Sequence, residues 1–193
     1  MAGLKSIVLT FLITVISGFS HLANSIEEAD YEVIREVGGI EIRHYPSLIQ
    51  AVTVLPGAAS SSEGFRRLAG FIFGGNEQAQ KIAMTAPVQE TLGEAQPTMA
   101  FTMPAQYALE ELPRPEDDRV KLQRLEARTV AVVSFSGWAT QARVARFERE
   151  LRKKLAANEI EISGDTSLNQ YNPPWTLPFL RRNEIMIEVD SPS

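Results

Sequence analysis

The stretch QYNPPWTLPFLRRNEIMIEV, residues 170–189, decides the fold, because a proline-rich corner leads directly into an apolar strand. Proline fixes φ and removes a backbone donor, so such a corner is rigid. KIAMTAPV, residues 81–88, is a second corner of this kind, and MAFTMP, residues 99–104, supplies the strand after it. Because corner and strand occur twice in this order, the sequence predicts a fold built from two related halves.

Alternating and helical patterns complete the first half. Gly38-Gly39 is a hairpin signal between two alternating runs. A helix with one buried stripe is expected behind a capping box at residues 60–63. The apolar side chains of that stripe recur at i, i+3, i+4 and i+7, and they are Phe65, Leu68, Ala69 and Ile72. The strands expected in this half are residues 31–37, 40–45, 48–55, 81–90 and 98–103.

A charged and proline-rich connection, residues 104–119, leads to the second half, which repeats the plan. Its expected strands are residues 120–125, 129–136 and 183–189. Its expected helix, residues 140–157, has an apolar side made of Val144, Phe147, Leu151 and Leu155. The other side is basic and carries Arg143, Arg146, Arg149, Arg152, Lys153 and Lys154. Each half reads strand, strand, helix, strand, strand, which predicts an α+β fold with one curled sheet.

The first 25 residues have the pattern of an export signal. Lys5 supplies a positive charge, residues 6–16 are an apolar run too short to span a bilayer, and Ala23-Asn24-Ser25 offers small residues for cleavage after Ser25. A retained membrane anchor is the alternative. We therefore expect residues 1–25 to be a signal peptide, residues 26–193 to form a single domain, and the protein to be exported, periplasmic or secreted.

Composition narrows the classes of function. The chain has 24 acidic against 19 basic residues, a net charge of −5, which disfavours general binding to nucleic acid or to an anionic membrane. It has no cysteine, so an exported form must rely on core packing and has no thiolate for catalysis or metal binding. We expect no stable membrane anchor after signal cleavage.

Several motifs together carry a family resemblance. KIAMTAPV, FTMP, the Phe-Ser-Gly of residues 135–137 and YNPPWTLPFLRRNEI resemble the SOUL/heme-binding protein family, in the family order and over residues 31–189. The chain looks like an exported, bacterial-type member. The resemblance implies a distorted antiparallel β-barrel flanked by two long helices. It also implies heme, bound without a covalent link, as the ligand.

The heme implied by the resemblance needs a flat apolar groove and cationic groups for its two propionates. The groove candidates are Phe65, Leu68, Phe71, Ile72, Met84, Met103 and Trp175. The candidate propionate partners, which would use charge-assisted hydrogen bonds, are Arg66, Arg67 and Lys81. A helix stripe normally packs on its own sheet, so plain core is the alternative for the apolar candidates.

One histidine follows residue 25 and is the candidate axial ligand of the heme iron. His44 lies in EIRHY, which resembles the segment where one vertebrate branch of the family has a histidine proposed to bind iron. The alternative is a half-buried structural histidine near a strand end. Met84 and Met103 could offer thioether sulfur, although methionines at this spacing more often pack in a core.

Catalytic signatures are missing from the chain. It has no G-x-S-x-G, H-E-x-x-H, P-loop or G-x-G-x-x-G motif. We therefore expect a non-enzymatic protein that binds heme or a related tetrapyrrole as a carrier or buffer. The alternatives are a binding module for another amphipathic small molecule, a hydrolase that uses His44 or a carboxylate pair, and an envelope protein that binds other proteins.

Overall fold

The computed structural model describes residues 26–56, 61–93 and 96–190. The expected signal peptide, residues 1–25, and Ser60 of the expected capping box lie outside these ranges. Within them, no helix is both long enough and apolar enough to cross a membrane. The strands are β1 Glu27–Glu28, β2 Glu32–Val37, β3 Ile40–Tyr45, β4 Leu48–Val54, β5 Thr85–Ala86, β6 Val88–Leu92, β7 Thr98–Thr102, β8 Val120–Leu125, β9 Arg128–Phe135, β10 Ile162–Gln170 and β11 Asn183–Val189. The helices are α1 Ser61–Ile72, α2 Gln141–Ala157 and the short 3-10 turns η2 Leu109–Glu111 and η3 Pro178–Leu180.

Most of the expected elements are confirmed, with two differences. The β2–β3 hairpin turns at Gly38 and Gly39, whose φ angles of 59° and 75° need glycine. The prediction of one strand over residues 81–90 was wrong. Residues Lys81–Met84 are irregular, and Pro87 separates the two strands β5 and β6 that follow. The strand β10 was not predicted at residues 162–170, because its sequence ISGDTSLNQ is polar and poor in β-branched residues.

The two halves form one nine-stranded antiparallel sheet and exchange a strand. Its order is β2-β3-β9-β11-β10-β6-β7-β4-β8. β6 and β10, one from each half, pair at the centre. β3 of the first half then pairs with β9 of the second, while β8 of the second half pairs with β4 of the first. Without β2, the two ends of the order carry equivalent strands of the two halves: β3, β9, β11 and β10 from one end, and β8, β4, β7 and β6 from the other. This symmetry confirms the two related halves, and the exchanged strands show that each half completes the other.

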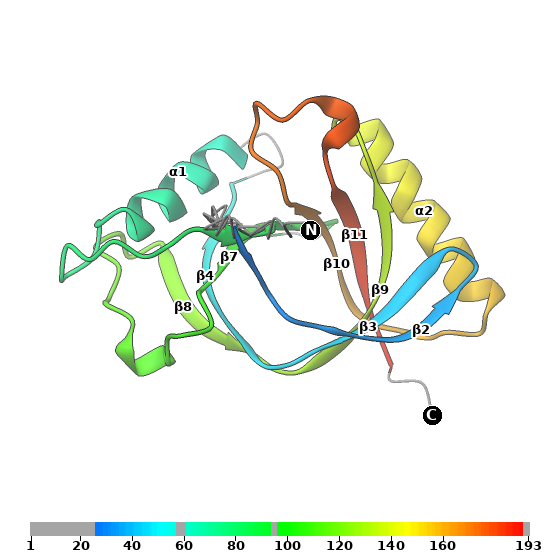
Figure 1. Ribbon diagram of the computed structural model, residues 1–193, viewed down its shortest axis with the longest axis horizontal. Helices are drawn as coiled ribbons and strands as arrows, with labels where there is room; N and C mark the ends of the chain where they lie inside the picture. The colour runs from blue at the N-terminus through cyan, green and yellow to red at the C-terminus, as the bar shows by residue number, and fades with distance from the viewer. Residues whose placement is uncertain (1–25, 57–60, 94–95, 191–193) are drawn as a thin grey trace, which may run out of the picture.

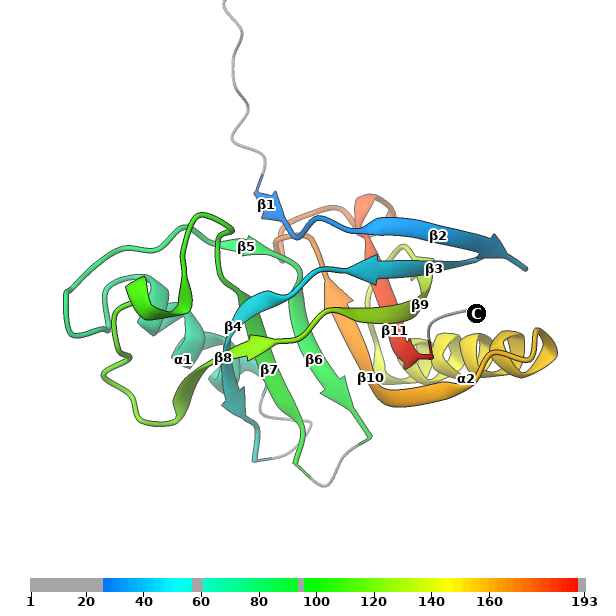
Figure 2. The ribbon, with the colours of Figure 1, turned by 90° about the horizontal axis from the view of Figure 1, so that it is seen from below.

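The sheet is strongly curved, with α1 and α2 on its outer side (Figure 1). The strand order nevertheless ends at β2 and β8, and these two edge strands do not pair with each other in the described part of the chain. The closed barrel implied by the resemblance is therefore not confirmed, because closure requires hydrogen bonds between the two edges. The structure is an open, curved sheet with one helix on each half, as the second view also shows (Figure 2).

Each helix covers its own hydrophobic core. Leu68, Phe71 and Ile72 of α1 pack with Ala51 of β4 and Phe101 of β7. Val144, Leu151 and Leu155 of α2 pack with alternate residues of β9 and β11, which are Ala131, Val133, Phe135, Ile185, Ile187 and Val189. The intervening residues of the same strands point to the concave side, because successive side chains of a strand face opposite ways. The sheet thus has an apolar outer face under the helices and a separate inner face.

Candidate functional site

The apolar groove predicted along α1 is occupied by the protein's own core. Leu68, Phe71, Ile72 and Met103 are all at most 4% exposed, and Met84 packs against the same cluster. Phe65 is 38% exposed and packs edge-on against Phe101, with ring centroids 5.4 Å apart. These side chains pack between helix and sheet, and their contact with a ligand stays a prediction.

The predicted propionate partners differ in how far their side chains are already engaged in hydrogen bonds within the protein. Arg67 is held by its own surroundings, since Nη1 donates to Thr53 Oγ1 at 2.6 Å and Nη2 donates to Glu63 at 2.7 Å. Arg66 is exposed, and among the described residues its one hydrogen bond goes to the Ser62 carbonyl, at 3.3 Å. Lys81 is exposed on the irregular segment before β5. Arg66 and Lys81 are therefore the members of this set that a solvent-borne anion can reach.

His44 and Trp175 lie near opposite ends of β9. His44 is exposed on β3, opposite Thr129 near the start of β9. Trp175 is 82% exposed in the connection between β10 and β11, which contacts Gly137 beyond the end of β9. The six residue-to-residue steps of β9 from Thr129 to Phe135 span about 20 Å at about 3.3 Å per step. The structure thus does not bring these two candidates together.

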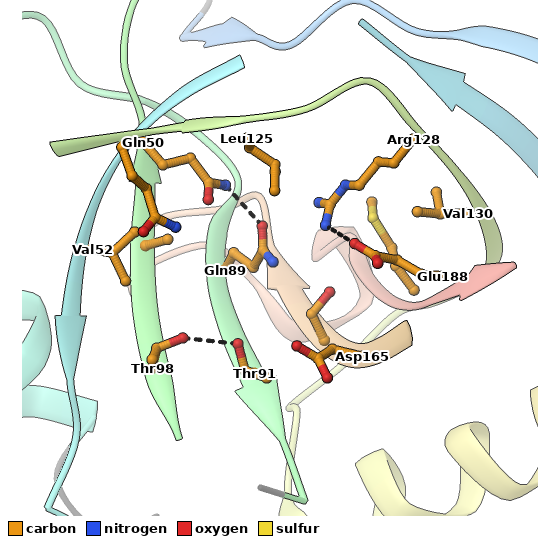
Figure 3. A pocket seen from close by; sticks show the side chains of 14 residues that line it. Gln50, Val52, Gln89, Thr91, Thr98, Leu125, Arg128, Val130, Asp165 and Glu188 are labelled. Carbon is orange, nitrogen blue, oxygen red and sulfur yellow. Dashed lines mark hydrogen bonds and ion pairs between the residues drawn. The ribbon is translucent and has the colours of Figure 1, made fainter. Parts of the chain in front are cut away.

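A polar cavity opens on the concave face of the sheet (Figure 3). Its volume is about 290 Å³, and inward-facing residues of β4, β6, β7, β8, β9, β10 and β11 line it. Gln50 Nε2 donates to Gln89 Oε1 at 3.1 Å across it, and the Thr91 and Thr98 hydroxyls lie 2.9 Å apart. Sequence reasoning missed these residues, because polar residues alternating with core residues predict a solvated strand face and not a shared cavity.

An ion pair with a close backbone approach lies at the β9–β11 side of this cavity. Arg128 Nη1 donates to Glu188 Oε1 at 2.6 Å. Gly164 lies beside Glu188, whose carboxylate occupies part of the space that a Cβ at residue 164 would need. The β10–β11 register is irregular between Ile162 and Thr166, as is common where a bulge redirects side chains near a site.

The concave face continues beyond this cavity. A constriction of about 20 Å³ shares Gln50, Gln89 and Arg128 with it. On its other side the constriction shares Leu48 and Thr102 with a cavity of about 410 Å³ beside β1. The inner face therefore carries neighbouring hollows from the sheet centre to the N-terminal strand.

Next to this line lies a buried charge network centred on Glu184, which is 1% exposed. Glu184 accepts hydrogen bonds from Arg43 at 2.9 Å, from the Tyr171 hydroxyl at 2.8 Å and from Arg182 at 3.0 Å. Burial favours the neutral acid, but Arg43, Tyr171 and Arg182 outweigh it and hold the pKa of Glu184 below its usual value.

Five large apolar side chains are exposed together at the other end of the second half, and we call them the apolar corner. They are Trp138, Trp175, Leu177, Phe179 and Leu180, each at least 54% exposed. The Gly137 amide donates to the Pro178 carbonyl at 2.8 Å and so ties the β9–α2 connection to the β10–β11 connection. Sequence reasoning identified only Trp175 here, although YNPPWTLPFLRR places apolar residues between prolines, where they cannot enter a strand.

Arginines border the apolar corner. Arg181 lies 3.7 Å from the Trp138 ring centroid and donates to the carbonyls of Thr176 and Pro174. Arg143, exposed in the first turn of α2, donates to the Ser136 carbonyl at 2.6 Å. A guanidinium has five donor hydrogens, so Arg143 keeps donors for an anion. Further along the helix, Arg152 and Lys154 are paired with Glu148 and Glu150, at 2.9 and 3.2 Å.

No cluster of His, Asp or Glu is arranged to hold a metal ion in the described ranges. Two features described above can receive a ligand: a polar cavity with charged walls and an apolar surface with cationic edges. The first suits a compact polar molecule. The second suits a large, flat apolar molecule that carries anionic groups.

Comparison with known proteins gives a family match. The family model described as SOUL heme-binding protein matches residues 26–188. Heme-binding protein 2 of Homo sapiens is 31% identical over 168 residues, which covers 76% of this chain and 80% of that protein. Heme-binding protein 1 of Mus musculus is 28% identical over 144 residues, covering 70% of this chain and 75% of that protein.

Solved structures show the same fold in proteins with other names. The C-terminal domain of EcmrR superposes with a TM-score of 0.61 at 13% identity, over 83% of this chain and 98% of that one. A structure described as a hydrolase from Listeria innocua has a TM-score of 0.55 at 11% identity, over 81% and 94%. At such identities these likenesses concern the fold alone.

Proposed function

The chain belongs to the SOUL heme-binding protein family, and from that premise we propose that it binds heme or a related tetrapyrrole. Binding is non-covalent and serves to carry or buffer the ligand, with no reaction performed on it. The observation that carries the choice of site is the apolar corner. Contiguous exposed apolar side chains on a soluble domain mark a surface that another molecule covers.

The apolar corner suits the face of a porphyrin ring. Trp138, Trp175 and Phe179 offer flat aromatic surfaces, which stack on a conjugated ring and bury large areas. Two of the three sit on connections fixed by prolines and by the Arg181 hydrogen bonds, so little conformational entropy is lost on binding. The concave cavity suits the ring less well, because its lining is rich in amide, hydroxyl and charged groups.

Arg143 is the proposed partner for a propionate. It is exposed at the start of α2, beside the Gly137 connection, and its guanidinium can pair with a carboxylate through two parallel hydrogen bonds. Arg66 and Lys81, predicted from the resemblance, are exposed on the other half of the sheet. They remain candidates for a second propionate only if the ring extends toward α1.

We propose that His44 does not bind the iron at this site. Its strand position lies about 20 Å, counted along β9, from the connection that holds the corner. Affinity then comes from apolar burial and propionate pairing. The absence of catalysis is supported by the exposed position of His44, the one histidine after the expected signal peptide. That signal in turn supports export as part of the proposal.

Titration with hemin, followed by the Soret absorption band, tests the proposal. Wild-type protein should saturate at one equivalent. The double substitution Trp175→Ala and Phe179→Ala should weaken hemin binding about a hundredfold or more, because each buried aromatic ring contributes roughly 1.5–3 kcal/mol. Phe73→Ala is the matched control, since Phe73 is 62% exposed just after α1 and lies outside the corner.

His44→Ala should leave both the affinity and the Soret position unchanged. Saturation in wild type with no loss in the double variant would remove the corner as the site. A shifted Soret band in His44→Ala would show iron ligation instead. A titration that never saturates would remove heme binding altogether.

A further inference from the structure

The outer side of α2 carries a row of cations, which we call the basic stripe. Its members are all exposed, and they are Arg146, Arg149 and Lys153. Spacings of three and four residues put them on one side of the helix, opposite the buried Val144 and Leu151. Among the described residues, none of the three makes a hydrogen bond or an ion pair, because the two carboxylates of the helix are paired with Arg152 and Lys154.

The stripe is positive although the chain as a whole is acidic. The helix Gln141–Ala157 holds six basic and two acidic residues, whereas the net charge of the whole chain is −5. Salt screens charges on a protein surface beyond about 8 Å under physiological conditions. At that range the stripe itself decides which partner is attracted, and it favours an anionic surface.

The apolar corner lies at the end of α2 where this helix begins. The hydrogen bond from the Gly137 amide to the Pro178 carbonyl joins the two connections there, and Arg143 donates to the Ser136 carbonyl from the first helical turn. In Figure 1 the β10–β11 connection stands at the end of the molecule where α2 begins. The stripe starts at Arg146, about 4.5 Å along the helix axis from Arg143. A surface that rests on the corner is therefore within electrostatic reach of the stripe.

The backbone of the corner suits an apolar environment. Three residues of the β10–β11 connection have no N–H to satisfy, and they are Pro173, Pro174 and Pro178. The Thr176 amide donates to the Pro173 carbonyl at 3.0 Å. The Arg181 guanidinium donates to the carbonyls of Thr176 and Pro174. Polar backbone groups are costly to bring into lipid unless the protein satisfies them, and these contacts reduce that cost.

The side chains of the corner are of the kinds found where proteins meet lipid. Trp138 and Trp175 carry the amphipathic ring that concentrates at the level of the headgroups. Leu177, Phe179 and Leu180 add exposed apolar groups. None of these residues lines the cavities described above, whereas protein partners usually anchor side chains in pockets. The corner thus suits a soft apolar layer better than a shaped protein surface.

We propose that the apolar corner and the basic stripe together dock the protein on an anionic lipid bilayer. The corner enters the headgroup region, and the stripe lies over the lipid phosphates. Each part alone gives weak attachment, so docking is peripheral, reversible and dependent on both. This partner goes beyond the proposed heme binding. Heme and the bilayer cover the same rings, so the corner takes one of them at a time.

Tryptophan fluorescence tests the proposal directly, because the two tryptophans of the chain, Trp138 and Trp175, both belong to the corner. Hemin-free protein is mixed with vesicles of equimolar phosphatidylcholine and phosphatidylglycerol. The emission should shift to shorter wavelength, and the protein should sediment with the vesicles. Vesicles of pure phosphatidylcholine should bind at least about tenfold more weakly, and high salt should release the protein.

Glutamine substitutions test the stripe. The stripe variant carries Arg146→Gln, Arg149→Gln and Lys153→Gln. It should bind the anionic vesicles about a hundredfold more weakly, because three cations near the lipid surface are lost. The matched control removes three exposed cations from β8 and the connection before it, through Arg114→Gln, Lys121→Gln and Arg124→Gln. The control has the same net charge as the stripe variant and should bind like wild type.

Alanine substitutions test the corner and keep both tryptophans. Leu177→Ala with Leu180→Ala should weaken sedimentation with the anionic vesicles about tenfold or more. Val54→Ala with Phe73→Ala is the control, because both residues are exposed in the first half of the chain. Hemin titration separates this proposal from the heme site, since the stripe variant should keep the wild-type hemin affinity.

Four results would overturn the proposal. The first is no sedimentation with anionic vesicles, which would leave an acidic protein as the partner to seek. The second is equal binding to the two kinds of vesicle. The third is an equal loss in the stripe variant and its control. The last is sedimentation with unchanged tryptophan emission, since another surface would then touch the lipid. Vesicle binding without hemin binding would support docking and remove only the heme site.

Discussion

Glu184 shows how one residue joins parts of the chain that are distant in sequence. Its carboxylate, on β11, accepts hydrogen bonds from Arg43 on β3 and from Tyr171 after β10. Arg43 is only 3% exposed and lies 4.3 Å from the Tyr31 ring centroid. The charges are therefore buried as a set, in which each member depends on the others.

Glu184→Gln should lower the free energy of unfolding by about 3–5 kcal/mol at pH 7, because it leaves the buried Arg43 guanidinium without its counter-charge. The pH dependence should change as well. The pKa of Glu184 is lowered in the folded protein, so its contribution is complete above the ordinary value of 4.5 and is lost as the pH falls further. Urea unfolding between pH 7 and pH 3 would therefore give a flatter stability curve below pH 4.5 in the variant.

Glu41→Gln provides the control for this prediction. Glu41 also pairs with Arg43, at 2.7 Å, but its side chain is 38% exposed, so water can replace the contact. We expect a loss of at most about 1 kcal/mol and a pH profile like that of wild type. Equal losses in the two variants would contradict the special role given to the buried carboxylate.

At the scale of elements, α1 shows which features a periodic pattern of apolar residues predicts and which features it does not. The spacing of Phe65, Leu68, Ala69 and Ile72 predicted a helix with one buried stripe. The structure confirms the helix and the burial of the last three residues, whereas Phe65 is 38% exposed. The same spacing is compatible with a ligand groove and with a core. In the structure Leu68, Ala69 and Ile72 pack in a core with residues of β4 and β7, and contact of the α1 side chains with a ligand stays a prediction. A pattern in one element does not report what the neighbouring element covers.

Leu68→Ala should lower the free energy of unfolding by about 2–5 kcal/mol, because Leu68 is fully buried and the surrounding side chains cannot fill the cavity. Hemin affinity of the folded variant should match wild type, since Leu68 lies in the core and outside the apolar corner. Urea denaturation and a hemin titration below the unfolding transition measure the two quantities. Phe65→Ala, at a 38% exposed position of the same helix, should cost less stability.

The exchange of β3 and β8 is a property of the whole molecule. Each half completes the sheet of the other, since β3 pairs with β9 and β8 pairs with β4. The central β6–β10 pairing adds a third contact between halves. Neither half has its full set of strand partners alone, so we expect the protein to unfold in one cooperative transition.

Leu68→Ala also tests this cooperativity. Both tryptophans, Trp138 and Trp175, belong to the second half, whereas Leu68 belongs to the first. In one cooperative unit the substitution should move the tryptophan fluorescence transition and the far-UV circular dichroism transition by the same amount of urea. A fluorescence midpoint that stays at its wild-type value would show that the halves unfold separately.

The amino-acid sequence determined the local features of this protein. Gly38-Gly39 fixed a hairpin, periodic apolar residues fixed both helices, and the repeated corners indicated two halves, because each of these depends on neighbours within a few residues. The motifs around the corners also carried the family. The strand β10 was not predicted from the sequence, because its polar residues form a strand only where β6 and β11 pair with it on both sides.

Only the tertiary structure decided which surfaces are filled and which are free. It placed Leu68, Phe71 and Met103 in the core, left Trp175 and its neighbours exposed, and gathered Asp165, Arg128 and Glu188 at one cavity. Those outcomes depend on strand order, register and exchange between the halves. These are set by contacts between residues far apart in the chain, which no local pattern encodes.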